Sequence, residues 1–220
     1  MHGIRHLRDR FHGVARVLGI IAVAATGLLL CAGCMGGRSA ERPMTFYVLE
    51  YEAPAASETA LFGDAVTVLR FSAAELYNGT AMLYRNEPYR RSAYHYHRWK
   101  VSPAAMISNL LYRDLSQSGL FAAVRTELSY EKSRYLLEGH VTEFLETDEG
   151  ERRSALLGVT ITISDSSKKE AARSICLQKD YRIAVPLDEE TPEGLVRAMS
   201  RAAETLSKEL GQDIRAALSD

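Results

Sequence analysis

The sequence of 220 residues lacks the short motifs that carry much of known enzyme chemistry. It has no glycine-rich phosphate loop, no Gly-x-Ser-x-Gly nucleophile elbow and no zinc-protease helix motif. Any ATP hydrolysis in which the protein takes part therefore belongs to a partner. These absences favour a protein that is not an enzyme, and the sequence offers no candidate catalytic residue.

A basic excess is also missing, since 27 lysines and arginines stand against 28 aspartates and glutamates. Proteins that bind nucleic acid normally carry a surplus of positive charge on one face. The charge balance therefore argues against a nucleic-acid partner. It gives no positive indication of any other partner.

Cysteine is scarce, with three in the chain: Cys31, Cys34 and Cys176. If Cys34 carries a lipid, as argued next, Cys176 is the only free thiol of the mature chain. No intramolecular disulfide can then form in an oxidising compartment, so stability must come from the core. We expect Cys176 to be buried and unreactive, facing inward with Ile175 or its neighbours, because nothing near it in the sequence would activate the thiol.

The main apolar run, residues 17–34, follows a basic leader and reads VLGIIAVAATGLLLCAGC. Its apolar part of roughly fourteen residues suits a secretory signal and is shorter than the roughly twenty residues of a membrane-spanning helix. Ala32-Gly33-Cys34 at its end is similar to a lipobox, in which the cysteine receives diacylglycerol and the signal peptidase cuts before it. Cys34 would then begin the mature chain with covalent N-acyl and S-diacylglycerol lipid, and no other cofactor is expected.

One position of this lipobox is atypical, because Leu, Val or Ile usually stands where Cys31 stands here. Two alternatives stay open, a plain signal that is cut near the alanines and an uncleaved membrane anchor. The expected organisation is a signal peptide at 1–33, a lipidated tether at 34–43 and one folded domain at 44–220. A fully extended tether would hold the domain within roughly 30 Å of the membrane.

Runs of aromatic and β-branched residues predict most of the folded part as strands. Residues 65–71 are apolar on both faces, which indicates a strand in the middle of a sheet. The last three runs are separated by polar turns and predict an antiparallel meander. The strands are expected at 45–51, 65–71, 80–85, 92–99, 135–145, 155–164 and 173–185, with a short strand or turn at 120–124.

Two helices are predicted to begin in the same way, with a capping hydroxyl before a proline. Ser102-Pro103 begins a helix of about sixteen residues that ends at Ser118-Gly119. Thr191-Pro192 begins a helix of roughly 25 residues, whose apolar stripe indicates packing on a sheet; a coiled-coil or membrane-surface helix is the alternative. The expected fold class is α+β with α/β-like layers, a mixed, mostly antiparallel sheet on which the middle and the long C-terminal helix pack.

Several short motifs occur in a characteristic order. After the leader come Tyr47-Val48-Leu49, Trp99 with Pro103, Ser118 to Phe121, Tyr135-Leu-Leu-Glu-Gly139 and the long C-terminal helix. This order, over residues 45–218, resembles the ABC-type transport auxiliary lipoprotein family, which includes the paraquat-inducible intermembrane lipoprotein. The resemblance implies a fold similar to the anticodon-binding type of domain, and no catalytic residues.

The resemblance also implies a non-enzymatic lipoprotein that faces the periplasm and serves the transport of phospholipid or other hydrophobic substrates. It would act by docking and membrane tethering, with an ATPase, a permease and a mammalian-cell-entry-domain protein as partners; a homo-oligomer stays open. Met35 after Cys34 indicates the outer membrane under the sorting rule of enteric bacteria, with retention in the inner membrane left open. The alternative function is a stand-alone envelope lipoprotein that carries a hydrophobic ligand or assists outer-membrane assembly.

Aromatic residues between positions 84 and 99 are the candidates for contact with a partner, because aromatic side chains dominate interface energetics. Alternatively they fill the core of the sheet. His95 and His97 alternate with tyrosines, which suggests one packed and one wet face of a strand; two imidazoles alone do not close a metal site, so no metal is expected. The candidate contact residues are Tyr84, Tyr89, Tyr94, Tyr96 and Trp99.

Overall fold

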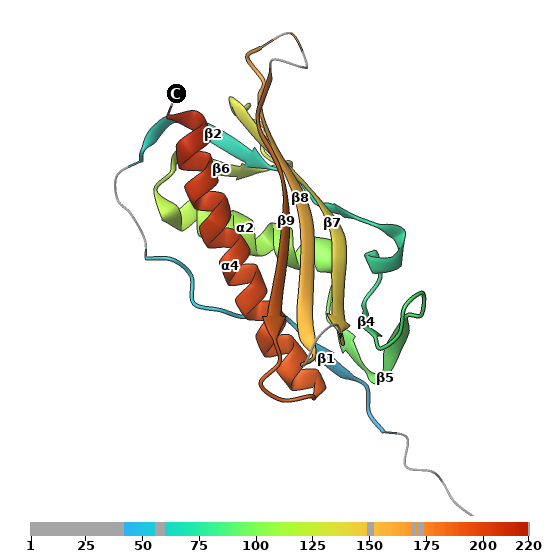
Figure 1. Ribbon diagram of the computed structural model, residues 1–220. Coiled ribbons are helices and arrows are strands. Elements are labelled where there is room, and N and C mark those ends of the chain that lie inside the picture. The colour runs from blue at the N-terminus through green and yellow to red at the C-terminus, as the bar shows by residue number, and fades with distance from the viewer. Residues whose placement is uncertain (1–41, 56–59, 149–151, 169, 171–173, 220) are drawn as a thin grey trace, which may run out of the picture. The chain divides into compact units, whose positions relative to one another are not determined.

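Strands, one short 3-10 helix and two α-helices make up the part of the chain that is described (Figure 1). This computed structural model describes residues 42–55, 60–148, 152–168, 170 and 174–219. The strands are β1 (Thr45–Tyr47), β2 (Phe62–Val68), β3 (Ser72–Ala73), β4 (Ala81–Arg85), β5 (Ser92–Trp99), β6 (Phe121–Thr126), β7 (Tyr135–Thr147), β8 (Ser154–Asp165) and β9 (Ile175–Pro186). The helices are η2 (Glu75–Tyr77), α2 (Pro103–Ser118) and α4 (Pro192–Leu218).

Strand β7 organises the sheet. One of its edges pairs in parallel with β2, β3 and β4 in succession, so the chain from β2 to β4 runs alongside it. Its other edge pairs with β8, and β8 pairs with β9, both antiparallel. Strands β1 and β6 lie at opposite ends of the order β1-β5-β4-β7-β2-β6. The predicted meander is thereby confirmed. Strand β2 lies inside the sheet, between β7 and β6, but next to its end and not at its centre.

The expectation of a mostly antiparallel sheet is wrong. Of the eight strand pairings in the described residues, five are parallel and three are antiparallel. Antiparallel neighbours are joined by short turns that are visible in the sequence, whereas parallel neighbours need long connections that leave no local signal. For the same reason the two-residue strand β3 was not expected. The likeness to an anticodon-binding domain stays a prediction.

Both α-helices begin at the residues that the capping signals predict, and α2 also ends where its glycine signal predicts. The Ser102 hydroxyl accepts a hydrogen bond from the Ala105 amide at 3.4 Å, and Gly119 ends α2 in the left-handed region with φ 64°. The Thr191 hydroxyl accepts a hydrogen bond from the Gly194 amide at 3.0 Å at the start of α4. The local sequence is therefore sufficient to define these helices.

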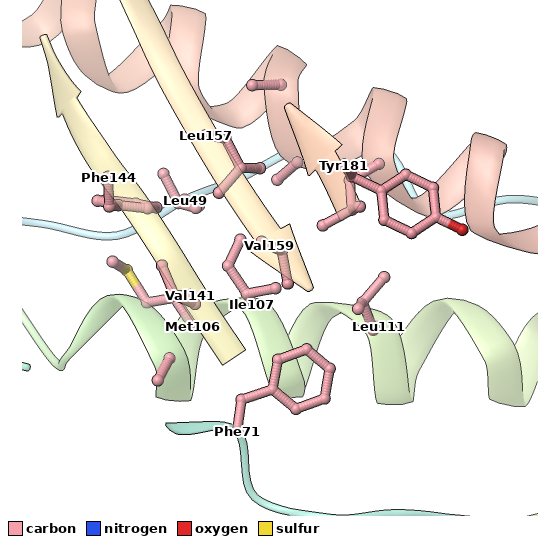
Figure 2. Close-up of a cluster of buried hydrophobic side chains, with 14 of the residues drawn as sticks. Leu49, Phe71, Met106, Ile107, Leu111, Val141, Phe144, Leu157, Val159 and Tyr181 are labelled. Atoms are coloured by element: carbon pink, nitrogen blue, oxygen red, sulfur yellow. The ribbon is translucent and has the colours of Figure 1, made fainter. Parts of the chain in front are cut away.

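The hydrophobic core lies between the sheet and the two α-helices (Figure 2). Helix α2 contributes Ile107 and Leu111, and the sheet contributes Val141 and Val159, which are all nearly inaccessible to solvent. Burying one such side chain stabilises a fold by about 1.5–3 kcal/mol. Helix α4 closes the same core with an apolar face made of Leu195, Ala198, Met199, Ala202, Ala203, Leu206, Leu210 and Ile214.

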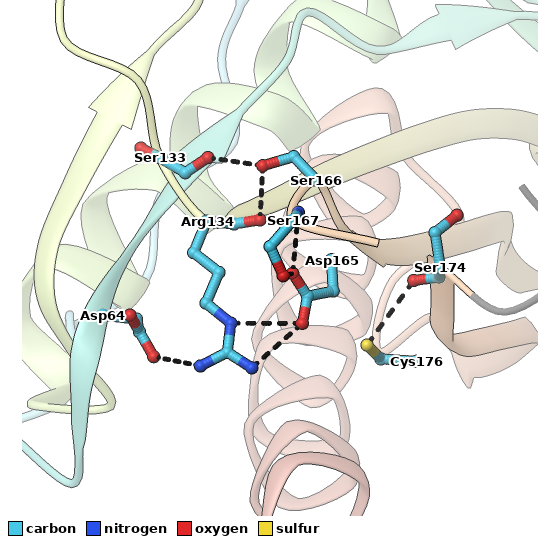
Figure 3. Close-up of polar contacts among 8 residues, drawn as sticks. All are labelled: Asp64, Ser133, Arg134, Asp165, Ser166, Ser167, Ser174 and Cys176. Atoms are coloured by element: carbon cyan, nitrogen blue, oxygen red, sulfur yellow. Dashed lines mark hydrogen bonds and ion pairs between the residues drawn. The ribbon is translucent and has the colours of Figure 1, made fainter. Parts of the chain in front are cut away.

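An arginine joins three strands at one end of the meander (Figure 3). Arg134, just before β7, contacts Asp64 of β2 at 2.7 Å and Asp165, the last residue of β8, at 3.0 Å. Asp165 is buried, and the hydrogen bond from Arg134 lowers the pKa of its carboxyl to about 2. Nearby, the half-buried Cys176 packs against the core and its thiol donates to the Ser174 carbonyl at 3.6 Å.

Candidate functional site

The structure separates the five candidate contact residues into three groups. Tyr89 and Tyr96 are exposed, whereas Tyr84 and Tyr94 are half-buried. Trp99 is only 1% exposed. It therefore lies in the core, as the alternative interpretation held, while the two exposed tyrosines are free to meet a partner.

Strand β5 bulges where it pairs with β4. The pairing shifts between Ala81 and Leu83, so β5 carries more residues than the stretch of β4 opposite it. Strict alternation would place Tyr94 and His97 on opposite faces, yet their rings meet edge to face with centroids 6.0 Å apart. The strand therefore does not have one packed face and one solvent-exposed face, as the sequence suggested.

Four rings form a continuous line across three strands, which we call the aromatic row: Tyr84 of β4, Tyr94 and His97 of β5, and Tyr47 of β1. The centroids of Tyr84 and Tyr94 are 5.3 Å apart in an edge-to-face contact. His97 stacks on Tyr47 at 5.7 Å. Each aromatic pair of this kind contributes about 0.5–1.5 kcal/mol beyond its buried area, so the row stiffens this end of the sheet.

Near one end, the aromatic row is fixed to the meander by a buried carboxylate. The Tyr94 hydroxyl donates to an oxygen of Glu146 at 2.5 Å, and Arg153 of the adjacent segment contacts the other oxygen at 3.3 Å. Glu146 is almost wholly buried, so both partners are needed to compensate its charge. Burial and the bond to Glu146 together raise the pKa of Tyr94 above its ordinary value.

The other end is fixed to the first turn of α4. The Tyr47 hydroxyl donates to Glu193 at 2.5 Å and lies 2.9 Å from Nδ1 of His97. Since the hydroxyl proton is used on Glu193, His97 must donate its Nδ1 proton to the Tyr47 oxygen. Burial and the bond to Glu193 raise the pKa of Tyr47 to about 12, and the same bond lowers the pKa of Glu193.

These contacts describe a rigid platform. The Nδ1 atom of His97 faces Tyr47, whereas His95 packs its ring edge-on against Tyr96 at 5.1 Å, so the two histidines do not converge. Within the described residues, no group of three histidine, cysteine, aspartate or glutamate side chains is placed to hold a metal ion. The row is therefore a preformed aromatic surface, and its hydrogen bonds are already made within the protein.

The tip of the β4–β5 hairpin presents an aromatic side chain in an unusual backbone conformation. Tyr89 has φ 62° and is fully exposed. A bulky residue in the left-handed region is strained, and such strain often accompanies a functional site. Beside it lies an open cleft of about 550 Å³. The cleft is lined by Tyr89, Arg85, Asn86, Glu87, Pro88, Arg91 and Asp148.

A model of the ABC-type transport auxiliary lipoprotein component family matches residues 47–211, well over half of the chain. The chain belongs to this family. The resemblance inferred from the motif order is thereby confirmed, and the protein is an auxiliary lipoprotein component of an ABC-type transport system.

Solved structures share the fold at low sequence identity. Protein XCC0632 from Xanthomonas campestris, of the DUF330 family, is 19% identical with a TM-score of 0.66, covering 76% of this chain and 91% of that chain. An uncharacterized protein is 12% identical with a TM-score of 0.60, covering 78% of this chain and 99% of that chain. No curated protein shows significant sequence similarity. At such identities these structures support the fold alone.

The features that would attach this family member to a membrane precede the described domain. Cys34 and the predicted signal peptide lie outside the described residues, so acylation of Cys34 stays a prediction. Within the described part of the chain, neither α-helix combines the length and hydropathy of a membrane span.

A second cleft, of about 420 Å³, lies between α2 and α4. Its floor includes Leu115 and Leu120, and its rim carries Glu204, Lys208 and Arg215. Sequence reasoning did not indicate this cleft, because it depends on how the two helices cross. It also missed Glu146, Arg153 and Glu193, which are too far from their tyrosines along the chain for any spacing rule to join them.

Proposed function

We propose that this family member is a non-enzymatic lipoprotein that docks onto an ABC transport system of the mammalian-cell-entry type and holds it at a membrane. The system would move phospholipid or another hydrophobic substrate across the cell envelope. Its other components would be an ATPase, a permease and a mammalian-cell-entry-domain protein. The observation that carries this proposal is the family match over residues 47–211.

The β4–β5 hairpin is the docking surface in this proposal. Tyr89 at its tip and Tyr96 on β5 are exposed. The aromatic row, which crosses the same hairpin, is held near one end by the part-buried hydrogen bond to Glu146 and at the other end by the hydrogen bond to Glu193. A partner that binds here would order few side chains, because the platform is already rigid. Exposed tyrosines on a rigid support are the residue type that most often dominates binding energy.

Acylated Cys34 is the anchor in this proposal, and the domain faces the periplasm from the outer membrane. The test uses the wild-type precursor in the presence of globomycin and a Cys34→Ser variant. Globomycin should block processing of the wild-type precursor, and the variant should leave the membrane fraction or stay as unprocessed precursor. Normal processing in the drug, together with unchanged membrane fractionation of the variant, would refute acylation at Cys34.

The partnership is tested by affinity purification of the full lipoprotein from detergent extracts of its native membranes. We expect the permease, the ATPase and the mammalian-cell-entry-domain protein to co-purify in fixed proportion, with their genes beside that of the lipoprotein. Purification without any of these subunits would favour a stand-alone envelope protein. Native mass spectrometry of the same sample reports bound lipid, which a carrier would retain, and the number of copies in any homo-oligomer.

A further inference from the structure

The first described strand and its two flanking residues carry an exposed apolar stripe, which we define as Met44, Phe46 and Val48. These residues are 43%, 53% and 42% exposed. Phe46 lies in the middle of β1, so its side chain points to the face opposite that of Thr45 and Tyr47, and Met44 and Val48 flank the strand on either side. Strand β1 is an edge strand that pairs only with β5 among the described strands.

The hydrogen bonds of Tyr47 fix the direction in which this stripe points. Tyr47 lies between Phe46 and Val48, and its hydroxyl is bonded on the inner side to Glu193 and His97. Strand β1 therefore cannot rotate about its axis to bury Phe46 without breaking both hydrogen bonds. The outward position of the stripe is a built feature of the fold.

Cations lie beside the apolar stripe. The register pairs Phe46 with Arg98 of β5, and directly paired residues share a face of the sheet. The Nζ atom of Lys100 lies 5.0 Å from the centroid of the Phe46 ring. The surface thus combines apolar side chains that protrude with positive charges at their edge, which is the composition that binds an anionic membrane surface.

We propose that the apolar stripe, with Lys100, inserts into the headgroup region of an anionic phospholipid membrane. This rests on the proposed function, in which the tether leaves the membrane at Cys34. Met44 follows Cys34 closely, so an extended tether places the stripe within roughly 30 Å of the lipid surface. Contact with the membrane would cover apolar side chains that are otherwise left in water, and it would set the angle at which the hairpin meets its partner.

The proposal is tested by quenching of tryptophan fluorescence with brominated phospholipid. Trp99 is the only tryptophan of the chain and is buried, so a tryptophan placed in the stripe reports on its surroundings above a constant background. The variants are Phe46→Trp and, as the matched control, Leu128→Trp, an 84% exposed position that follows the opposite edge strand β6. The mature chain is held on phosphatidylglycerol-containing vesicles by an N-terminal polyhistidine tag and a nickel-chelating lipid.

Brominated lipid should lower the emission of the residue 46 tryptophan about twofold and leave the residue 128 tryptophan unchanged. Adding Lys100→Glu, or using neutral vesicles, should reduce the quenching of the former. Equal quenching of both variants, or none in either, would overturn the proposal. Protection of residue 46 from aqueous iodide without quenching by lipid also overturns it, because a second copy or a protein partner would then cover the stripe.

Two precautions keep the outcomes distinct. Because the tag replaces the acyl anchor, failure of Cys34 acylation leaves the quenching result intact, and a quenching failure leaves the globomycin result intact. Circular dichroism verifies that Phe46→Trp is folded, and Val48→Trp takes its place if it is not.

Discussion

The ring of Phe71 lies against the backbone of Gly139 on β7, so closely that a Cβ atom on Gly139 would stand 2.1 Å from Cε2 of the ring. Phe71 lies in the segment that connects β2 to β3, and its buried side chain is part of the core. The glycine at the end of the Tyr135-Leu-Leu-Glu-Gly139 motif therefore has a packing role. It leaves the space in which an aromatic ring can lie directly on a central strand.

Replacing this glycine should destabilise the protein. We expect Gly139→Ala to lower the free energy of unfolding by about 1–3 kcal/mol or more, because the new methyl group forces the Phe71 ring out of its place. Gly79→Ala is the control, since a Cβ there would meet nothing within 4 Å. Its effect should stay within about 0.5 kcal/mol. Urea unfolding measures both, and equal effects would contradict the packing role.

The contribution of the Arg134–Asp165 contact to the stability of the protein should change with pH in the acid range. The carboxyl of Asp165 has its pKa lowered to about 2, so its ionised form stabilises the folded state above the ordinary value of 3.8, and this contribution is lost as the pH falls through 2. Asp165→Asn should lower the free energy of unfolding by about 1–3 kcal/mol at pH 6. The gap from wild type should narrow between about pH 4 and 2, and a gap that does not change with pH would exclude this origin.

The Tyr47–Glu193 hydrogen bond should show its pH dependence on the alkaline side. The pKa of Tyr47 is raised from 10.0 to about 12, so the folded state holds the phenol proton more tightly. The stabilisation is complete below pH 10 and is lost as the pH rises towards 12. Tyr47→Phe should be less stable than wild type by about 1 kcal/mol at pH 8, and the two should converge above pH 10.

Urea unfolding at pH 8 and pH 11 measures this difference. Tyr96→Phe, at an exposed position of β5, serves as the control and should behave as wild type at both values. A Tyr47→Phe variant with unchanged stability at pH 8 would show that the bond to Glu193 contributes nothing to the fold.

The parts of the fold that were predictable from the sequence are those with local causes. The hydroxyls of Ser102 and Thr191 and the left-handed Gly119 set the helix limits from within a few residues. The polar turns between β7, β8 and β9 set the meander in the same way. The parallel contacts of β7 with β2, β3 and β4 have no local cause, because they depend on how distant segments share one core.

The sequence predicted which types of residue make up the candidate site, but not how they are arranged. The run from Ser92 to Trp99 was correctly read as an aromatic strand, yet its pattern could not show that Tyr94 and His97 meet on one face while Tyr96 is exposed. That difference follows from the bulge in β5 and from packing against β4 and β1. The carboxylates that fix the aromatic row come from β7 and α4, and the exposed state of the apolar stripe follows from the edge position of β1.

Photo-crosslinking tests the docking claim most directly. A photoreactive amino acid takes the place of Tyr89 in the full lipoprotein within its native membrane, and in a matched strain it takes the place of Tyr130, an equally exposed tyrosine that follows β6. We expect irradiation to join residue 89, and not residue 130, to a subunit of the ABC transport system. No crosslink to any such subunit from residue 89, or equal yields from both positions, would contradict docking through the β4–β5 hairpin.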